Sequence, residues 1–270
     1  MRGWTLGSGS SGNALLIESG AHRLLVDCGF GPRALVTRLK AIGVAPESIS
    51  ALLVTHEHVD HAQGAERVQK KYRWPVYGSA GTLGALRDVE PRWRRPIAPG
   101  ETITLDGFSL EAAAIPHDAA APLAFAITAT ASGARVGVAH DLGAVPDALR
   151  SMFARCDALC LEANHDVELL RNGPYPYALQ QRIRGGRGHL SNVEAAALAS
   201  ELVGPTVRAI ALLHLSEANN RPELAEREVT RAARRAGYAG PVVAAARRTP
   251  APAFALGATA AVSVQLQLGV

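Results

Sequence analysis

Four potential metal ligands lie within one short segment of the chain, His56-Glu57-His58-Val59-Asp60-His61. This segment holds three of the nine histidines of the protein. Neutral imidazole and carboxylate groups are the usual protein ligands of zinc and manganese. Two pairs of such ligands from one loop can serve two ions about 3.5–4 Å apart. The segment therefore predicts a centre that holds two divalent metal ions.

The residues around this segment indicate how it is positioned. Ala51–Val54 is a short, wholly apolar run, which is typical of a strand buried on both faces. His56 and His58 are two residues apart, so an extended backbone points both side chains the same way. Asp60 and His61 then follow in the turn into a helix. A histidine-rich polar loop is the alternative, but it does not explain why a buried strand ends in four potential ligands.

The remaining pattern predicts an α/β fold, with strands first and strand–helix alternation after them in each half. The expected strands are Asn13–Ile17, Arg23–Asp27, Ala51–Val54, Glu101–Leu105, Phe108–Ile115, Leu123–Thr130, Arg135–Ala139, Ala158–Glu162 and Arg208–Leu213. The expected helices are Ala34–Ile42, Gly64–Tyr72, Pro146–Phe153, a helix from the Ser191/Glu194 capping box to about Val203, and Pro222–Arg235. We expect helices that cover two packed mixed sheets, a four-layer αββα sandwich in a single domain over residues 1–270.

Composition sets outer limits on the function. The 270 residues are 48% hydrophobic and 19% charged, as in an ordinary globular protein. No apolar run is long enough to span a bilayer, and the N-terminal residues lack the apolar stretch of a signal peptide, so we expect a cytoplasmic protein without a membrane partner. The net charge of +4 permits an anionic substrate but does not require one. The three cysteines show no zinc-ligand spacing.

The segment Val54–His61 resembles the His-x-His-x-Asp-His signature of the metallo-β-lactamase superfamily. Further segments resemble the other motifs of that family, in the same order and across nearly the whole chain. Leu25–Gly29 resembles the first motif, whose Asp, here Asp27, braces the metal loop rather than binding metal. The third, fourth and fifth motifs are matched by Ile115-Pro116-His117-Asp118, His140-Asp141-Leu142-Gly143 and Leu213-His214-Leu215-Ser216.

This resemblance implies a role for each matching residue. His117 is the expected third ligand of the first ion, Asp141 bridges both ions, and His214 completes the shell of the second. The implied ligands are His56, His58, Asp60, His61, His117, Asp141 and His214, around two divalent ions, zinc or manganese. His140 departs from the family pattern, because relatives usually carry a small hydroxyl residue at that position.

Two further segments favour phosphodiester cleavage. Leu161–Asp166 and Gly188–Asn192 resemble paired elements of the nuclease branch, such as tRNA 3′-processing enzymes. There a His protonates the leaving oxygen and a Glu orients that His, which implies His189 as general acid and Glu162 as its orienting residue. Structural roles are the alternatives, a helix cap holding His189 and a buried partner for Glu162. Flavodiiron relatives carry Glu where this chain has His58, which disfavours oxygen chemistry.

Within the superfamily, the chain most resembles the YycJ-like (WalJ) subgroup, whose members are associated with exonuclease action on DNA. The likeness rests on Leu6–Asn13, Glu162–Asp166, Gly188–Asn192 and His214–Asn220. The Gly/Ser-rich first segment could offer backbone N–H groups to a phosphate, or it is simply a tight turn. The expected substrate-binding residues are Ser8, Ser10, Asn13, Asn164, His165, Arg182, Arg184 and Arg187.

The three arginines of that set precede His189 and could hold neighbouring phosphates, with glycines between them keeping the segment mobile. A solvated basic loop is the alternative. No segment indicates a separate substrate-binding arm, so a long polymer is expected to lie along the domain itself.

The function implied by the resemblance is hydrolysis of phosphodiester bonds, with DNA degraded from a 5′ end. Asp60 would both bind metal and accept a hydrogen bond from the attacking water, which the ions activate. Two alternatives stay open. One is a small-molecule phosphodiesterase, like the cyclic-phosphate hydrolases of phosphonate metabolism. The other is a non-catalytic metal- or RNA-binding protein, against which the apparently complete ligand set argues.

Overall fold

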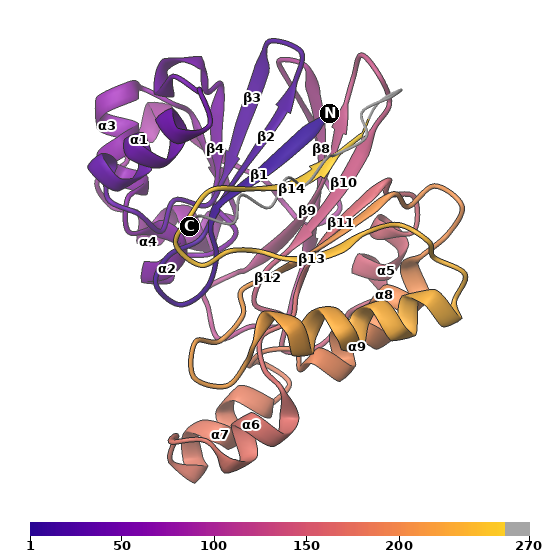
Figure 1. Ribbon diagram of the computed structural model, residues 1–270. Helices are drawn as coiled ribbons and strands as arrows, with labels where there is room; N and C mark the ends of the chain where they lie inside the picture. Colours follow the sequence, from indigo (N-terminus) through magenta and orange to yellow (C-terminus); the bar gives the residue numbers. More distant parts are fainter. Residues whose placement is uncertain (257–270) are drawn as a thin grey trace, which may run out of the picture.

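The structure is a computed structural model that describes residues 1–256, so the end of the expected 1–270 domain lies outside the described residues. Two seven-stranded sheets form its centre (Figure 1). Across the first sheet the strands are β14 (Ala251–Ala255), β1 (Arg2–Gly7), β2 (Ala14–Ser19), β3 (His22–Val26), β4 (Ala51–Leu53), β5 (Val76–Gly78) and β6 (Arg94–Pro96). Across the second they are β13 (Val242–Ala244), β12 (Ala209–Leu213), β11 (Ala158–Glu162), β10 (Arg135–Ala139), β9 (Leu123–Ala129), β8 (Phe108–Ala114) and β7 (Thr102–Leu105).

Helices cover the outer face of each sheet. The α-helices are α1 (Pro32–Ala41), α2 (Val59–Ala62), α3 (Ala65–Tyr72), α4 (Ala80–Ala85), α5 (Asp147–Phe153), α6 (Val167–Asn172), α7 (Tyr177–Arg184), α8 (Asn192–Leu202) and α9 (Pro222–Arg235). Two short 3₁₀ helices are η1 (Pro46–Ser48) and η2 (Pro91–Trp93). In Figure 1, α1 and α3 lie against the first sheet, and α5, α8 and α9 lie against the second.

Three hydrophobic clusters hold these layers together. One lies between the sheets and includes Phe108 and Phe125. A second joins the first sheet to α1 and α3 through residues such as Leu35, and a third joins the second sheet to its helices through residues such as Phe153. The expected four-layer αββα sandwich is therefore confirmed. No helix among residues 1–256 has both the length and the apolar character needed to cross a membrane.

The capping box expected before α8 is also confirmed. The hydroxyl of Ser191 accepts from the backbone N–H of Glu194 at 3.2 Å, and the Glu194 carboxylate accepts from the backbone N–H of Ser191 at 2.8 Å. These contacts satisfy two N–H groups at the helix end that would otherwise lack partners. They fix the N-cap of α8, Ser191, only two residues after His189.

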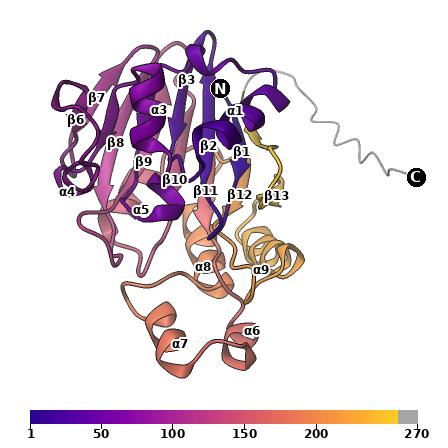
Figure 2. The same ribbon diagram turned by 90° about the vertical axis from the view of Figure 1, so that its left-hand side faces the viewer.

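The region between β11 and α8 differs from the expectation. Helices α6 and α7 form an arm, residues 167–188, that projects from the sandwich (Figures 1 and 2). The sequence indicated no separate arm, so this projection differs from the expectation, and whether the arm binds substrate is untested. Arg182 and Arg184 lie in α7 rather than in a loop, and no residue of α7, which the structure describes in full, is buried. The pattern of α7 was missed because it has no core-facing apolar stripe.

The glycines that follow α7 allow close backbone approach. A Cβ atom added at Gly188 would lie 2.2 Å from the carbonyl oxygen of Ile183, and one at Gly143 would lie 2.4 Å from Cα of Arg187. The backbone N–H of His189 donates to the same Ile183 carbonyl at 2.9 Å. Gly188 therefore has a packing role, which sets the position of His189, and mobility from Gly185 and Gly186 stays a prediction.

Replacing Gly188 with Ala should therefore destabilise the protein by roughly 1–3 kcal/mol, the usual cost of overpacking against backbone. Gly186 has open space around its Cα, so Gly186→Ala is the matched control in the same loop and should change stability little. Urea unfolding of both variants checks this. Equal midpoints for the two variants would show that the loop adjusts freely.

Candidate metal centre

The strand topology brings the predicted ligands to one edge of the sandwich. Strand β4 runs parallel to β3 and ends just before His56, while β10, β11 and β12 run parallel to one another. Asp141 follows β10 and His214 follows β12. Strand β8 is antiparallel to β9, which is antiparallel to β10, so the end of β8 before His117 lies at the same edge. Segments far apart in the chain thus meet because their strands end together.

The first group of ligand atoms belongs to His56, His58, His117 and Asp141, and these atoms lie within 4.8 Å of one another. Nε2 of His117 is 3.3 Å from Nδ1 of His58, and Nε2 of His56 is 3.2 Å from Oδ2 of Asp141. The Gly188 carbonyl accepts from Nδ1 of His117 at 3.0 Å, which leaves Nε2 directed at the group. The loop after α7 therefore orients one of the predicted ligands.

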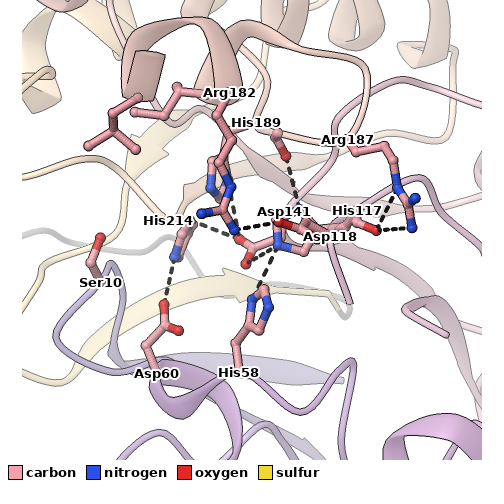
Figure 3. Close-up of a pocket in the computed structure, with 13 residues that line it drawn as sticks. Ser10, His58, Asp60, His117, Asp118, Asp141, Arg182, Arg187, His189 and His214 are labelled. Carbon is pink, nitrogen blue, oxygen red and sulfur yellow. Dashed lines mark hydrogen bonds and ion pairs between the residues drawn. The ribbon is translucent and has the colours of Figure 1, made fainter. Parts of the chain in front are cut away.

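The second group consists of Asp60, His61, Asp141 and His214, again within 4.8 Å. Nε2 of His214 lies 3.0 Å from Oδ2 of Asp60 (Figure 3), and Nε2 of His61 lies 3.2 Å from Oδ2 of Asp141. Asp141 is the residue common to both groups. Its Oδ2 is equally distant from His56 and His61, the position that a bridging carboxylate requires.

Burial and charge shift the pKa values of these groups in opposite directions. Burial would raise the pKa of Asp141, but His214 and His61 hold it well below its usual value. Burial would lower the pKa of His61, but the carboxylates of Asp141 and Asp27 raise it to about 10. Burial, with the charge of His61, lowers the pKa of His56 to about 4.

The composition of the two groups fits divalent cations. Each group combines imidazoles, which bind metals in their neutral form, with carboxylates. These are the donors found at zinc, manganese and iron sites. Among the described residues, Nε2 of the fully buried His56 and Oδ1 of Asp141 make no well-aligned hydrogen bond, although they lie 3.2 Å from Oδ2 of Asp141 and 2.9 Å from Nδ1 of His214, respectively. Buried polar atoms of this kind need a partner, and a bound cation supplies one.

A second set of buried contacts orients His61. Oδ2 of Asp27 accepts from Nδ1 of His61 at 2.7 Å and from the hydroxyl of Thr55 at 2.9 Å, while Oδ1 accepts from the Thr55 backbone N–H at 2.8 Å. His140 also contacts Oδ2 of Asp27 through Nδ1, at 3.0 Å. The bracing contact implied for Asp27 is present, and His140 belongs to it rather than to the ligand groups.

Three residues of the centre have a left-handed backbone. The φ angles of Asp27, Asp141 and His214 are 62°, 51° and 55°. Side chains other than glycine rarely adopt this region, which costs of order 1–3 kcal/mol per residue and is found mostly at functional sites. Each of the three follows the end of a strand, so the conformation turns the chain sharply where its side chain must enter the centre.

His189 and Glu162 form a pair beside the ligand groups. Nδ1 of His189 lies 2.7 Å from Oε1 of Glu162, whose Oε2 accepts from the backbone N–H groups of Leu142 and Leu190 at 2.7 and 3.1 Å. Burial would lower the pKa of His189, but the negative charge of Glu162 raises it. Burial would raise the pKa of Glu162, but His189 lowers it to about 2. Glu162 therefore holds a proton on an imidazole whose side chain is 20% exposed.

A cavity of about 290 Å³ opens over these groups. Figure 3 shows it between Ser10 on one side and Arg182 and Arg187 on the other. The cavity is lined by Ser10, His58, Asp60, His117, Asp118, Asp141, Leu179, Arg182, Ile183, Arg187, Gly188, His189 and His214. Arg184, the third arginine predicted to bind substrate, does not line it.

Four other predicted substrate-binding residues lie beneath this surface. Ser8 accepts from the His214 backbone N–H at 2.8 Å, and Nδ2 of Asn13 lies 3.1 Å from Nε2 of His61. Nδ2 of Asn164 donates to the carbonyl of His214 at 3.0 Å. His165 is 2% exposed and does not line the cavity. The contacts of the first three residues support the ligands, and a direct role in substrate binding stays a prediction for all four.

Three residues that line the cavity were given no role from the sequence. Asp118 directly follows His117, and this adjacency was the available signal. Leu179 and Ile183 come from α7 and make that side of the cavity apolar. Their spacing of four residues places them on one face of a helix, but the segment was not identified as helical.

Comparisons with known proteins agree with this geometry. Residues 22–215 match the model of the family described as beta-lactamase superfamily domain. The chain is 34% identical over 226 residues to exodeoxyribonuclease WalJ of Streptococcus pneumoniae serotype 2, which covers 82% of this chain and 83% of that protein. It is 32% identical over 237 residues to exodeoxyribonuclease YycJ of Bacillus anthracis, covering 86% and 89%.

The fold also matches a solved structure, the metallo-β-lactamase fold protein YhfI from Bacillus subtilis. The TM-score is 0.70 at 20% identity, with 93% of this chain and 98% of that chain covered. The chain belongs to the metallo-β-lactamase superfamily and, within it, to the group of the YycJ and WalJ proteins.

Proposed function

We propose that this protein is a dinuclear metal-dependent exodeoxyribonuclease that degrades DNA from a 5′ end. The observation that carries the proposal is the arrangement inside one cavity. Two ligand groups share Asp141, and the His189–Glu162 pair lies directly beside them. The names of the WalJ and YycJ relatives support DNA as the substrate. A centre with one ion would need only one set of ligands, whereas here two sets of potential ligands share the Asp141 carboxylate.

The residues divide into ligands and proton-transfer groups. His56, His58 and His117 would hold the first ion, Asp60, His61 and His214 the second, and Asp141 both. The ions, zinc or manganese, would supply an activated water and neutralise charge on the phosphate. Asp60 lines the cavity and would accept a hydrogen bond from the attacking water.

His189 supplies the proton that the departing sugar oxygen needs. Because Nδ1 donates to Glu162, the other ring nitrogen, Nε2, is the atom left to face the substrate. The raised pKa of His189 favours the protonated ring, the form that a general acid requires. The Glu162 carboxylate accepts from two backbone N–H groups, which hold it in place, so we assign it the positioning of the ring and not the transfer of the proton.

The sides of the cavity would hold the DNA strand. Arg182 and Arg187 line it and can each bind a phosphate with parallel hydrogen bonds. Ser10 lines the opposite side, in the Gly/Ser-rich turn between β1 and β2. A strand lying between these sides passes over the ligand groups. Arg184 does not line the cavity and would serve only the more distant part of a strand.

The direct test is a substrate panel. Metal-loaded protein should shorten 5′-labelled DNA and release labelled mononucleotides or short fragments at the earliest times. RNA and small cyclic or linear phosphodiesters, given at matched phosphate concentration, should react much more slowly. Cleavage of the cyclic diester with intact DNA and RNA would replace the nuclease assignment with that of a small-molecule phosphodiesterase. Fully loaded protein that cleaves none of them would favour a binding role.

The metal content tests the role of Asp141. Protein purified without chelator should contain up to two divalent ions per chain, because the two groups of potential ligands predicted from the sequence share Asp141. Asp141→Ala should weaken the binding of both ions while the fold survives, since Asp141 itself belongs to none of the three hydrophobic clusters. Elemental analysis and circular dichroism measure the two effects. A loaded wild-type sample that never exceeds one ion would exclude the bridging role.

Substitution of His189 tests the general acid. His189→Ala should keep the metals and slow cleavage of natural diesters by roughly 10²–10⁴-fold. A diester with a nitrophenolate leaving group needs little protonation and should lose much less. Comparing the turnover of the two substrates distinguishes a catalytic role of His189 from a structural one. Equal losses on both substrates would indicate a structural role.

A further inference from the structure

One ion pair links the projecting arm to the loop that carries His117. The guanidinium of Arg182, on α7, pairs with the carboxylate of Asp118, which follows β8 and lies 64 positions earlier in the chain (Figure 3). Both residues line the cavity, with side chains 68% and 54% exposed. Asp118 is an exposed carboxylate paired with a guanidinium, so it places a negative charge in a cavity that must accept a phosphate.

Polar and backbone contacts hold α7 and the residues after it over the cavity. Besides the ion pair, the guanidinium of Arg187 donates to the carbonyl of His117 at 3.3 and 3.4 Å, and the carbonyl of Ile183 accepts from the backbone N–H of His189 at 2.9 Å. No residue of the fully described α7 is buried, so hydrophobic packing does not fix its position. The Arg182–Asp118 pair is exposed, and exposed ion pairs stabilise a structure only weakly. A ligand that offers Arg182 a better partner can therefore break this contact.

We propose that Asp118 is a specificity-determining residue. Its carboxylate binds the Arg182 guanidinium at the position that a phosphate of the substrate would otherwise take. This proposal rests on the proposed function. Carboxylate and phosphate both present paired oxygens to a guanidinium, so the two compete for Arg182. A single phosphate that replaces the Asp118 carboxylate on Arg182 gains little binding energy, because one ion pair is exchanged for another. A DNA strand also contacts Arg187 and the metal centre, and these contacts compensate for the lost Arg182–Asp118 pair. Asp118 therefore favours polyanionic strands over small anions.

The test measures binding, so that it does not depend on cleavage. All proteins carry the His189→Ala substitution and zinc, and the probe is a 5′-phosphorylated DNA strand with a 3′ fluorescein. Asp118→Asn should lower the Kd of this strand about threefold to tenfold, because it frees Arg182 and removes a like charge. Fluorescence anisotropy gives the Kd, and elemental analysis confirms the metal content. Asp118→Ser should act in the same way if the first variant binds less metal.

Glu168→Gln is the matched control. Glu168 forms an exposed ion pair with Arg171 on α6 of the same arm, with side chains 61% and 63% exposed, and neither residue lines the cavity. This substitution also removes one negative charge and frees one arginine. It should leave the Kd within about twofold of its starting value, since only distant screened charge changes. Equal tightening in both variants would overturn the proposal, because general charge would then explain it.

A double-mutant cycle separates competition from simple addition of charges. Arg182→Gln should weaken strand binding more in the Asp118→Asn variant than in the protein with Asp118 intact. The two losses should differ by roughly twofold to fivefold. The same loss in both backgrounds, or no tightening by Asp118→Asn, would overturn the proposal. A strand that binds as described here but is not cut by the enzyme with His189 intact would overturn the proposed function alone. A strand that does not bind at all would overturn both.

Discussion

The burial of a single carboxylate, that of Asp141, determines most of what surrounds it. A carboxylate removed from water loses hydration that only nearby cations or hydrogen-bond donors can replace. The imidazoles of His56, His61 and His214 approach it to within 3.2 Å, and two groups of metal ligands share it. The strand ends, the left-handed turns and the contact between Asp27 and His61 all serve to keep these rings in place around one charge.

Much of the fold and the ligand set could be predicted because the relevant signals are local. His56, His58, Asp60 and His61 occupy one segment after an apolar strand, and the buried strands and the capping box each have a short pattern. His117, Asp141 and His214 are single residues at the ends of separate strands. Only the family resemblance joined them, because spacing along the chain says nothing about which strand ends meet.

The arm and its contacts could not be predicted, for a physical reason. Helices are recognised by an apolar stripe that faces a core, and α7 has no core to face. Its glycine-rich continuation was read as mobile, although Gly188 lies where two backbones pack closely. The pairing of Arg182 with Asp118 joins positions 64 residues apart, and nothing in either local sequence indicates a partner. The role of His140 beside Asp27 was hidden in the same way.

The weak attachment of the arm has a consequence for how such proteins diversify. Substitutions on α7 remove no buried contacts, so selection can alter its length, charge and aromatic content with small effects on folding. The proposed metal ligands lie at the ends of strands that also build the core, so changes there affect folding as well as the centre. The exposed residues of α7 are free of this constraint. Descendants of one ancestor can therefore acquire new substrates by changing these residues, while Gly188 and the proposed ligands stay the same.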